Sequence, residues 1–599
     1  MLRRPPVDGQ GRLAARNGYS SSIQLFLSVK NREIAKILYD MAELLELKGE
    51  NRFKIIAYSK AARAIESLKE DIEDVWRQGE LKAIPGVGKA IADKVREYLE
   101  TGQIQSYQIL VAETPPGLTE LLQVQGMGPK TVALLHDKLG VTNIDQLEQA
   151  ALQHRIRRLP RMGATREANI LKSIDRYRRR STRIPLYVAK PIVDQILDYL
   201  GQIPGLEHIT VAGSFRRGRE TVGDIDILAT SSSPEAVIGA FVQMPSVEEV
   251  LGQGPTKASV IVKETVQVDL RIVDHRSYGT VIQYFTGSKE HNVKLRGLAL
   301  QRGYSLSEYS LKRVATGEEL YFDREEDVYA RLGLPYIPPE LREDRGEIEA
   351  ALAGKLPRLV ELQDIKGDLH VHSAWSDGLG SLEELASAAQ GLGYQYLGLC
   401  DHSPSVGIAG GLSEERLQEK IAAVEKFNQG QDGFRMLAGT EVDIKADGSL
   451  DYPDRILESC DLVVASIHMA QNQTEREING RLISAIENEH VDIIAHPTGR
   501  LIGRRDPYDV DLQAVLEAAR GTGTIMEINA HPNRLDLDDH WSRVAKDMGV
   551  PVAINTDSHA PDQLRLMSYG IRVARRGWLE AGEVVNTRPL TDLLPLLDR

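Results

Sequence analysis

Cysteine and aromatic residues are scarce in this sequence, and it contains no long apolar run. Its only two cysteines, Cys400 and Cys460, exclude a disulfide scaffold and a cysteine-rich zinc module, and they indicate a reducing compartment. No apolar run approaches the roughly 18 residues that a membrane span requires, which excludes an integral membrane protein. With 599 residues, 42% of them hydrophobic, the chain is predicted to fold into about three to five domains.

Basic residues are concentrated in the first third of the chain, and acidic residues in the remainder. Residues 1–183 contain 31 Lys and Arg against 22 Asp and Glu, a balance of +9, so the other residues contribute −22 to the net charge of −13. An excess of positive charge favours a polyanionic partner such as nucleic acid. Histidine is also uneven, since nine of the fourteen lie between His370 and His559.

Helical periodicity dominates the basic part of the chain. Residues 1–29 contain four arginines and one acid, and they are predicted to be a disordered N-terminal extension. From residue 30 onward, apolar residues recur at helical spacing with glycines between the runs. We therefore expect two helical domains, at residues 30–110 and 111–183.

A glycine-rich turn between predicted helices occurs twice in this part, at residues 81–89 and 122–130. Its glycines let backbone N–H groups at a helix N-terminus face outward, where they can bind phosphate without reading base sequence. A weaker third copy lies at residues 159–163, with Arg161 at a glycine position. A single copy would be compatible with ordinary helix punctuation, but two copies in a basic region predict DNA binding. The predicted DNA contacts are Gly86, Gly88, Lys89, Gly126, Gly128 and Lys130.

Three aspartates in the next region lie on two predicted strands. Asp224 and Asp226 are two residues apart, so both point to one face of a strand. Asp269 lies on the polar face of the alternating segment 266–273. Neighbouring carboxylates repel one another unless divalent cations neutralise them, which predicts a two-metal site for phosphoryl transfer. Solvated acids at a sheet edge are the alternative, which the Gly-Ser…Asp-x-Asp spacing disfavours.

This region resembles the X family of DNA polymerases, and specifically the bacterial members related to DNA polymerase beta. The resemblance covers residues 30–340 and rests on segments 213–218, 223–226 and 284–288, together with Asn292 and Arg296. It implies a nucleotidyltransferase palm at residues 184–279 and a thumb-like domain at residues 280–340, which would bind nucleotide and template.

The same resemblance implies roles for individual residues. Asp224, Asp226 and Asp269 would be the catalytic metal ligands for Mg²⁺ or Mn²⁺, and Asp269 would also orient or deprotonate the primer hydroxyl. Arg296 would contact the template strand. The residues that would bind the nucleotide are Ser214, Arg217, Gly223, Tyr284, Phe285, Gly287, Ser288 and Asn292.

Two positions depart from the family pattern. Lys289 stands where polymerase beta has an acid near the incoming base, so the family's contacts to the nucleotide are uncertain at this position. Lys94 occupies the position of the Schiff-base lysine of that enzyme, whereas Ala90 replaces its nearby phosphate-binding lysine. Lys94 is therefore expected to be either the nucleophile of a 5′-deoxyribose-phosphate lyase or a simple phosphate contact.

Histidines gather in the last part of the chain, beyond a predicted linker at residues 341–364. Short apolar strands alternate there with helices over residues 365–599, which is the pattern of a β/α barrel. His370 and His372 share one face of a strand, so both can bind one metal ion. Other His, Asp and Glu residues end separate strands, and the strand ends of a barrel meet at one rim.

This last region resembles the polymerase-and-histidinol-phosphatase (PHP) family. The family's nine metal ligands match His370, His372, Asp377, His402, Glu441, His468, His496, Asp557 and His559. The resemblance implies up to three Zn²⁺, Mn²⁺ or Fe ions, with Glu441 as the bridging ligand. Such a site can activate water to hydrolyse a phosphate ester.

The chain is thus predicted to be a multidomain α+β and α/β protein with a helix-hairpin-helix region, a palm with a thumb and a distorted TIM-like barrel. Resemblance implies a template-directed DNA polymerase that fills gaps in base-excision repair. Its barrel would be a 3′–5′ exonuclease, with 3′-phosphatase or abasic-site endonuclease as further reactions. The expected partners are dNTPs and gapped or nicked double-stranded DNA with a 5′-phosphate. We expect a monomer in the bacterial cytoplasm, at the nucleoid. A monovalent cation at the hairpin turns is a further candidate cofactor.

Three alternatives remain. The barrel could act on a small phosphate ester, or the palm could be an inactive DNA-end scaffold beside an active phosphatase or nuclease. The chain could also be an untemplated nucleotidyltransferase. The complete set of Asp224, Asp226 and Asp269 disfavours the scaffold, and Arg296 disfavours untemplated addition.

Overall fold

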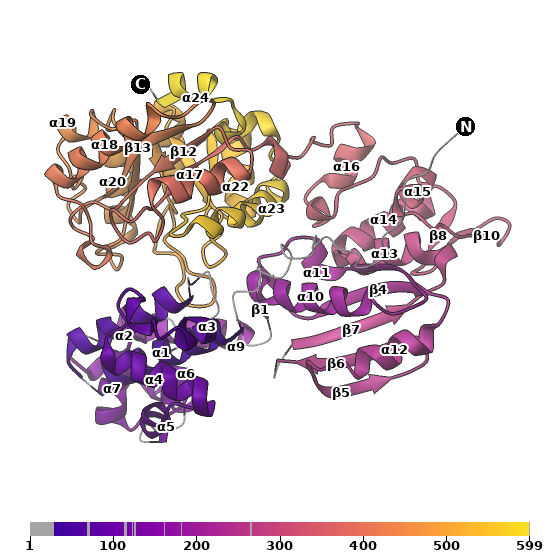
Figure 1. The fold of residues 1–599 in the computed structure, drawn as a ribbon. Helices are drawn as coiled ribbons and strands as arrows, with labels where there is room; N and C mark the ends of the chain where they lie inside the picture. The colour runs from indigo at the N-terminus through magenta and orange to yellow at the C-terminus, as the bar shows by residue number, and fades with distance from the viewer. Residues whose placement is uncertain are drawn as a thin grey trace, which may run out of the picture. The chain divides into compact units, whose positions relative to one another are not determined.

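The computed structural model describes residues 29–597, apart from residues 49, 67, 69–71, 113–116, 123, 125–126, 161, 181–182 and 264–265. The chain forms two compact units, Met1–Tyr177 and Arg178–Arg599 (Figure 1). The predicted extension at residues 1–29 lies outside the described residues except for Val29, which begins the first helix. Among the described residues no helix is long and apolar enough to cross a membrane.

The first unit is helical and has two hydrophobic cores. One core is formed by buried side chains between Ile34 and Ile104, the other by side chains between Leu118 and Ile174. Glycines cap α4, α6 and α7, because they allow the left-handed or extended backbone of a cap. The helices are α1 (Val29–Leu47), α2 (Arg52–Glu66), α3 (Ile72–Arg77), α4 (Lys89–Thr101), α5 (Gln105–Ala112), α6 (Leu118–Leu121), α7 (Pro129–Leu139), α8 (Ile144–Leu152) and α9 (Ala164–Arg180).

A five-stranded sheet forms the palm at the start of the second unit. Its strand order is β2-β4-β7-β6-β5, and the parallel neighbours β4 and β7 lie at its centre. Residues alternate along β7, so that Val268 and Leu270 enter the core with helices α10 and α12, while Asp269 lies on the other face. The bounds are β2 (Leu206–Val211), β4 (Ile225–Ser231), β5 (Val247–Gln253), β6 (Lys257–Val262), β7 (Val266–Ile272), α10 (Leu186–Leu200), α11 (Gly213–Arg216) and α12 (Pro234–Val242). A short ribbon of β1 (Ile184–Pro185) and β3 (Thr221–Val222) lies beside them.

The thumb joins four helices and a small three-stranded sheet. Its helices are α13 (Tyr278–Thr286), α14 (Lys289–Gln301), α15 (Glu325–Arg331) and α16 (Glu347–Leu352), and its strands are β8 (Tyr304–Leu306), β9 (Leu311–Arg313) and β10 (Glu319–Leu320). The predicted linker at residues 341–364 requires correction, because α16 lies within it. Leu341, Ile348 and Ala351 pack in the thumb core, and Arg342 is fully buried against Glu325. This segment is therefore part of the thumb core rather than a free tether.

Seven parallel strands in sequence order, β11 to β17, form the barrel. A parallel bridge between Val371 and Ser558 brings the first strand to the last. The strands are β11 (Gly367–Val371), β12 (Tyr396–Leu399), β13 (Arg435–Asp443), β14 (Leu462–Ser466), β15 (Ile493–Ile494), β16 (Ile525–Asn529) and β17 (Val552–Asn555). The helices between and after them are α17 (Leu382–Gly391), α18 (Glu414–Asn428), α19 (Asp454–Leu457), α20 (Glu475–Ile486), α21 (Leu512–Thr522), α22 (Asp539–Met548), α23 (Met567–Arg576) and α24 (Leu590–Leu597).

Two apolar layers hold the barrel together. One layer lies between strands and helices, and a second fills the barrel interior and includes Leu369, Leu437 and Ile493. Leucines of α24 pack on the interior layer, and the hydroxyl of Tyr396, the first residue of β12, donates to the carbonyl of Arg588 at 3.0 Å. The last helix therefore closes the N-terminal end of the barrel and leaves the C-terminal strand ends for chemistry. The predicted fold class is confirmed, with a barrel of seven strands.

One lysine is completely buried in this barrel. The Lys420 ammonium donates to the Asp401 carboxylate at 3.0 Å and to the carbonyls of Leu399 and Gly439 at 3.0 and 2.7 Å. Leu399 ends β12, Asp401 lies two residues after that strand, and Gly439 lies in the middle of β13. The ammonium therefore joins two strands.

We predict that Lys420→Met destabilises the barrel by about 3 kcal/mol, because Asp401 would remain buried without its cation. Thermal unfolding followed by circular dichroism measures this change. Glu419→Gln, at an exposed neighbour in α18, is the matched control and should unfold like the natural protein. Equal midpoints for the two variants would show that Lys420 contributes no stability.

Candidate active sites

The three predicted palm carboxylates come from two adjacent strands. Asp226 in β4 and Asp269 in β7 are direct neighbours across the parallel pair, and Asp224 lies exposed immediately before β4. Gly213 allows the preceding loop to approach them, because its φ is +60° and a Cβ there would lie 2.5 Å from Oδ2 of Asp226. Strand register therefore brings together the carboxylates that the sequence singles out.

Electrostatic repulsion marks this group as a cation site. Burial, followed by the charges of Asp224 and Asp269, raises the pKa of Asp226 to about 7. A carboxyl group in this position is stabilised in its ionised form by a divalent cation. The acids thus fit the Mg²⁺ or Mn²⁺ that the sequence predicts.

Two neighbours of Asp269 are absent from the sequence prediction. The Gln267 side-chain amide donates to Asp269 Oδ1 at 3.0 Å, and Lys257 Nζ lies 3.7 Å from Oδ2. Both share the open face of the sheet with Asp269. Gln267 lies two residues before Asp269 in β7, and Lys257 lies in the neighbouring strand β6. The strand register that places both beside Asp269 cannot be recognised from a single sequence motif.

Aromatic and basic side chains meet where the nucleotide and template are expected. The Tyr284 and Phe285 rings lie 5.2 Å apart, edge to face. The Arg296 guanidinium lies 5.1 Å from the Tyr284 ring centre, and that of Arg271 lies 4.8 Å from the Phe285 ring centre. Tyr284, Phe285 and Arg296 are therefore brought together, and Arg271 joins them.

The turn between α13 and α14 is held by two other predicted nucleotide residues. Asn292 is nearly buried, and its side chain donates to the carbonyl of Tyr284 at 2.7 Å and accepts from Gln283 at 2.8 Å. Ser288 caps α14 by accepting from the backbone N–H of His291 at 3.2 Å. Gly287 precedes it with φ +70°. These residues shape the turn, and exposed Lys289 begins the helix beside it.

Arg217, the predicted triphosphate ligand, faces protein groups in this structure. Its Nε donates to Glu343 Oε1 at 3.0 Å, and Nη1 donates to the carbonyl of Thr286 at 2.5 Å. The preceding Ser214 lies in the short helix α11, and Gly223 lies next to Asp224. Arg217 is thus near the expected site but paired with a carboxylate that the sequence does not predict.

The described residues of the two hairpins share one backbone hydrogen bond and one glycine cap. The backbone N–H of Val87 donates to the carbonyl of Ile84 at 3.0 Å, as that of Met127 does to Val124 at 3.0 Å. Gly88 and Gly128 are the extended caps of α4 and α7. Gly126 lies outside the described residues.

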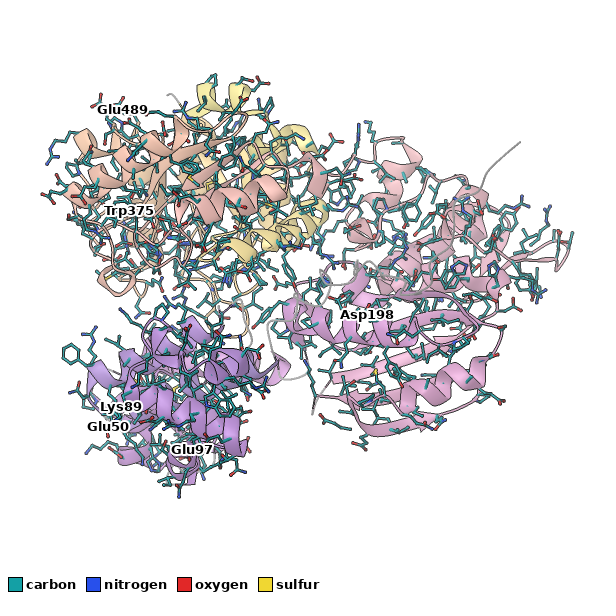
Figure 2. All side chains as sticks on the ribbon, viewed as in Figure 1. Glu50, Lys89, Glu97, Asp198, Trp375 and Glu489 are labelled. Carbon is teal, nitrogen blue, oxygen red and sulfur yellow. The ribbon has the colours of Figure 1, made fainter. Side chains whose placement is uncertain are left out.

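Lysines flank both turns. Lys89 begins α4 and is exposed (Figure 2), Lys130 is exposed at the start of α7, and Lys94 is half-buried farther along α4. Gly86, with φ +80°, lies so close to α2 that a Cβ would be 3.2 Å from Cβ of Lys60. The hairpin therefore presents basic residues at a helix start, as the sequence predicts.

The nine predicted barrel ligands lie at the C-terminal ends of the barrel strands. His370 belongs to β11 and Glu441 to β13, and the other seven follow β11, β12, β14, β15 or β17. They form three groups whose ligand atoms lie within 4.8 Å of one another. The groups are His372, Asp377, His402 and His559; His370, His372 and Asp557; and His402, Glu441 and His468. His496 joins them through its Nε2, which lies 3.0 Å from Glu441 Oε1.

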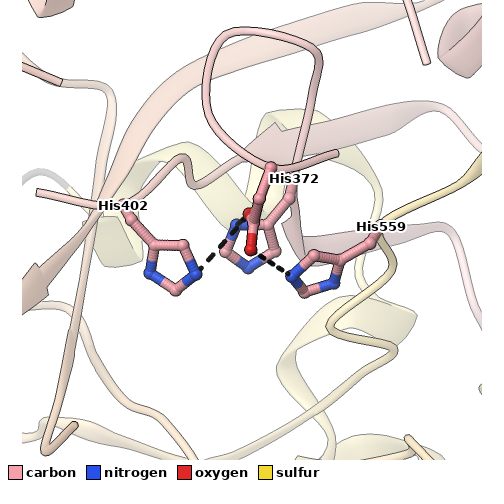
Figure 3. Close-up of side chains that lie close together, drawn as sticks. His372, His402 and His559 are labelled. Atoms are coloured by element: carbon pink, nitrogen blue, oxygen red, sulfur yellow. Dashed lines mark ion pairs between the residues drawn. The ribbon is translucent and has the colours of Figure 1, made fainter. Parts of the chain in front are cut away.

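Ring nitrogens and carboxylates of the first group converge. Figure 3 shows the rings of His372, His402 and His559 close together. Asp377 lies among them, with its carboxylate oxygens 3.4 Å from His559 Nε2 and 3.7 Å from His402 Nε2. Nε2 of His372 also lies 3.2 Å from Nε2 of His370. Two imidazole nitrogens directed at one point are typical of a shared metal.

Charge complementarity dominates this rim. Burial would raise the pKa of Glu441, but His468, His402 and His370 hold it well below its usual range. Burial likewise opposes a positive charge on His370, while Glu527 and Glu441 raise its pKa well above the ordinary value. Cations would supply the positive charge that these histidines otherwise carry.

A second observation also indicates that these side chains suit metal ions. His372 Nδ1 and His496 Nδ1 are buried and have no hydrogen-bond partner among the described residues. Buried polar atoms without partners are rare in proteins, and ligand nitrogens are a recognised exception. The mixture of imidazole and carboxylate without thiolate suits Zn²⁺, Mn²⁺ or Fe.

Two acidic residues that support the ligands lie outside the predicted ligand set. Glu527 Oε1 lies 2.8 Å from His370 Nδ1, and its Oε2 accepts from the backbone N–H of His496 at 2.8 Å. Asp401 accepts from Ser373 and Ser376 in the loop that carries Asp377. Carboxylates in this position orient ligand imidazoles. A single acid within the apolar strand β16 is the signal that could have identified Glu527.

Family profiles match consecutive segments of the chain between residues 29 and 531. A helix-hairpin-helix domain matches residues 29–104 and a helix-hairpin-helix tandem matches residues 118–176. The DNA polymerase beta palm matches residues 183–272, and the DNA polymerase beta thumb matches residues 281–343. The PHP domain matches residues 368–531.

Among curated proteins, the chain is 40% identical over 570 residues to DNA polymerase/3′-5′ exonuclease PolX of Bacillus subtilis, covering 95% of this chain and 99% of that protein. The chain belongs to the PolX family. Rat DNA polymerase lambda is 26% identical over 52% of this chain and 56% of its own length. A probable phosphatase of Thermoanaerobacter sp. is 30% identical over 37% of this chain and 89% of its own length.

In this PolX-family chain, the carboxylate of Glu441 lies within 2.8–3.6 Å of ring nitrogens of five ligand histidines, namely His370, His372, His402, His468 and His496. We predict that Glu441→Gln lowers the metal content of the purified protein by at least one ion per chain, because it removes a charge at the centre of the rim. Inductively coupled plasma mass spectrometry after dialysis measures the content. His540→Asn, at an exposed histidine of α22, is the control. Unchanged metal content in Glu441→Gln would show that this carboxylate holds no ion.

Proposed function

We propose that the chain is a template-directed DNA polymerase that fills short gaps during DNA repair, and that its barrel is a metal-dependent 3′–5′ exonuclease. The observation that carries the polymerase proposal is the register that places Asp226 beside Asp269, next to a glycine loop and an arginine. The observation that carries the hydrolase proposal is the convergence of nine ligands at one barrel rim. The similarity to the Bacillus subtilis protein supports both.

In the palm, each residue would have a separate task. Asp224 and Asp226 would hold divalent ions, and Asp269, oriented by Gln267, would hold an ion and the primer 3′-hydroxyl. Ser214 and Arg217 would bind the triphosphate, and Arg217 would first leave Glu343. Tyr284 and Phe285 would face the sugar, and Arg296 on the Tyr284 ring would reach the template strand.

In the barrel, the nine ligands would hold up to three ions, with Glu441 between them. Divalent ions at both centres would lower the pKa of water or of a hydroxyl group and stabilise charge on a phosphate. Glu527 would fix the His370 ring, and Asp401 would hold the loop that carries Asp377. The substrate phosphate would enter at the open strand ends.

The first unit would bind the DNA on either side of the gap. The two hairpin turns at Gly88 and Gly128 present helix N-termini beside exposed Lys89 and Lys130. Backbone N–H groups and lysines there would bind phosphates, including a 5′-phosphate at the gap. Lys94 would add either a phosphate contact or lyase chemistry.

Removal of a 3′-phosphate is a second candidate activity of the barrel, suggested by the similarity to a probable phosphatase. The probable phosphatase matches 235 residues of the chain, about the length of the barrel, which favours removal of a 3′-phosphate as a further reaction. The chemistry would use the same ligands, since in both reactions water attacks the phosphorus atom and the 3′-oxygen of the remaining strand leaves. The released group is inorganic phosphate in one case and a nucleoside 5′-monophosphate in the other. A 3′-phosphorylated primer distinguishes the two reactions.

We predict that the two activities separate by mutation. On a 5′-labelled primer at a one-nucleotide gap with Mn²⁺, Asp226→Asn should lose extension by at least about 100-fold, because it removes a charged ion ligand, and should still shorten the primer. Glu441→Gln should show the reverse pattern. Denaturing gel electrophoresis of the primer measures both.

The controls are His540→Asn, which should keep both activities, and a 3′-phosphorylated primer for the phosphatase reaction. If the natural protein shortens but never extends the primer, the palm is a scaffold and the polymerase proposal is wrong. If it extends but neither shortens the primer nor removes the 3′-phosphate, the barrel acts on a small ester instead.

A further inference from the structure

The loop that carries the predicted triphosphate ligands touches the barrel as well as the palm. Residues 213–220, here called the nucleotide loop, include Ser214 and Arg217. Three barrel arginines reach this loop: Arg500, and Arg572 and Arg576 of α23. Nothing in the sequence motif of the palm predicts these contacts, because they join positions hundreds of residues apart.

Arg572 packs against the middle of the nucleotide loop. Its guanidinium lies 5.5 Å from the centre of the Phe215 ring, and its Nη1 donates to the carbonyl of Phe215 at 3.4 Å. A Cβ on Gly218 would lie 3.5 Å from Cβ of Arg572. The helix α23 therefore lies directly against the loop backbone.

Arg576 holds the nucleotide loop at Arg217, the predicted triphosphate-binding residue. Its side chain is 4% exposed, and its Nη1 donates to the carbonyl of Arg217 at 2.9 Å and to Glu343 Oε1 at 2.9 Å. Its Nη2 donates to Asp539 at the start of α22, at 2.7 Å. One barrel residue thus contacts both the backbone of Arg217 and the carboxylate that pairs with the Arg217 side chain.

Glu343 is shared among several cations. It accepts from Arg217 at 3.0 Å, from Arg219 at 3.3 Å and from Arg576 at 2.9 Å. A carboxylate bonded to three guanidinium groups binds each one less tightly than it would bind a single partner, because they compete for the same two oxygens. Arg576 therefore weakens the hold of Glu343 on Arg217.

Arg500 anchors the far end of the nucleotide loop. Its Nη2 donates to Glu220 at 2.7 Å, and its Nε donates to the carbonyl of Arg534 at 2.8 Å. The loop is consequently fixed to the barrel at Phe215, Arg217 and Glu220. The barrel thus contacts the loop that would bind the triphosphate.

We infer that Arg576 is a positioning residue for nucleotide binding in the palm: it fixes the backbone of Arg217 and competes for Glu343, so that the Arg217 side chain can turn to a triphosphate. Arg572 supports the same loop. This inference rests on the proposed polymerase function and adds to it a part for the barrel that is separate from hydrolysis. The ligand is the triphosphate, which all incoming dNTPs share.

Removing Arg576 should weaken nucleotide binding in a specific way. We predict that Arg576→Gln raises KM for the complementary dNTP on gapped DNA by about fivefold, as expected for coupled neighbours, with a smaller change in kcat. Hydrolysis of a 3′ end by the barrel should not change, since Arg576 is not among its ligands. Arg520→Ala, at an exposed arginine of α21, is the control for both activities.

Glu343→Gln distinguishes this role from simple loss of structure. Without its charge, residue 343 competes less for Arg217, so Glu343→Gln alone should lower KM for dNTP, and the Arg576→Gln/Glu343→Gln pair should recover most of the loss. Loosened packing would instead give a double variant worse than either single change. That result, or an unchanged KM in Arg576→Gln, would overturn the inference.

Isothermal titration with a non-hydrolysable dNTP on primer-terminated gapped DNA gives a readout that is independent of turnover. If the natural protein incorporates no nucleotide, the polymerase proposal fails, and the titration still tests the inference. Weaker binding in Arg576→Gln that Glu343→Gln restores would support it. Equal binding in all variants would refute it.

Discussion

Both centres of this protein depend on holding ionisable side chains close together at buried or partly buried positions of parallel strands. In the palm, Asp226 has a pKa of about 7 because burial, Asp224 and Asp269 all oppose its charge. In the barrel, Glu441 is kept ionised by the surrounding histidines. Parallel strands tolerate such crowding because their ladders fix each Cβ, and the repulsion that remains is what a divalent cation relieves.

The arginines at the junction of palm and barrel follow from the same constraint. Glu343 and Asp539 are partly buried acids, and Arg217, Arg345 and Arg576 neutralise them. Buried charges of this kind contribute little net stability but are costly when a partner is lost, so they fix one relative geometry. The polymerase loop and the hydrolase barrel are thereby coupled within one unit of the chain.

Much of this organisation could be predicted from the sequence. The Gly-Asp-x-Asp spacing identifies the palm acids, and alternation places Asp269 on the same face, because strand periodicity is local. The His-x-His pair and the strand-end acids identify the barrel ligands in the same way. The short apolar strands likewise indicate the barrel.

The remainder depends on tertiary contacts that local pattern cannot show. Strand β5 has mostly exposed residues and lacks an apolar signal. The charged residues before α16 favour a linker, whereas Arg342 in that stretch is buried and paired with Glu325. The partner of Arg217 lies 126 residues away in the chain. The contact between Lys420 and Asp401 likewise depends on how α18 packs against the strands.

Anomalous diffraction from crystals grown with Mn²⁺, a dNTP and gapped DNA would locate the ions directly. Two metal-dependent centres in one chain predict peaks beside Asp224, Asp226 and Asp269 and separate peaks among the barrel histidines around Glu441. Peaks in the barrel alone, with the palm acids unoccupied beside a bound nucleotide, would contradict a working polymerase centre.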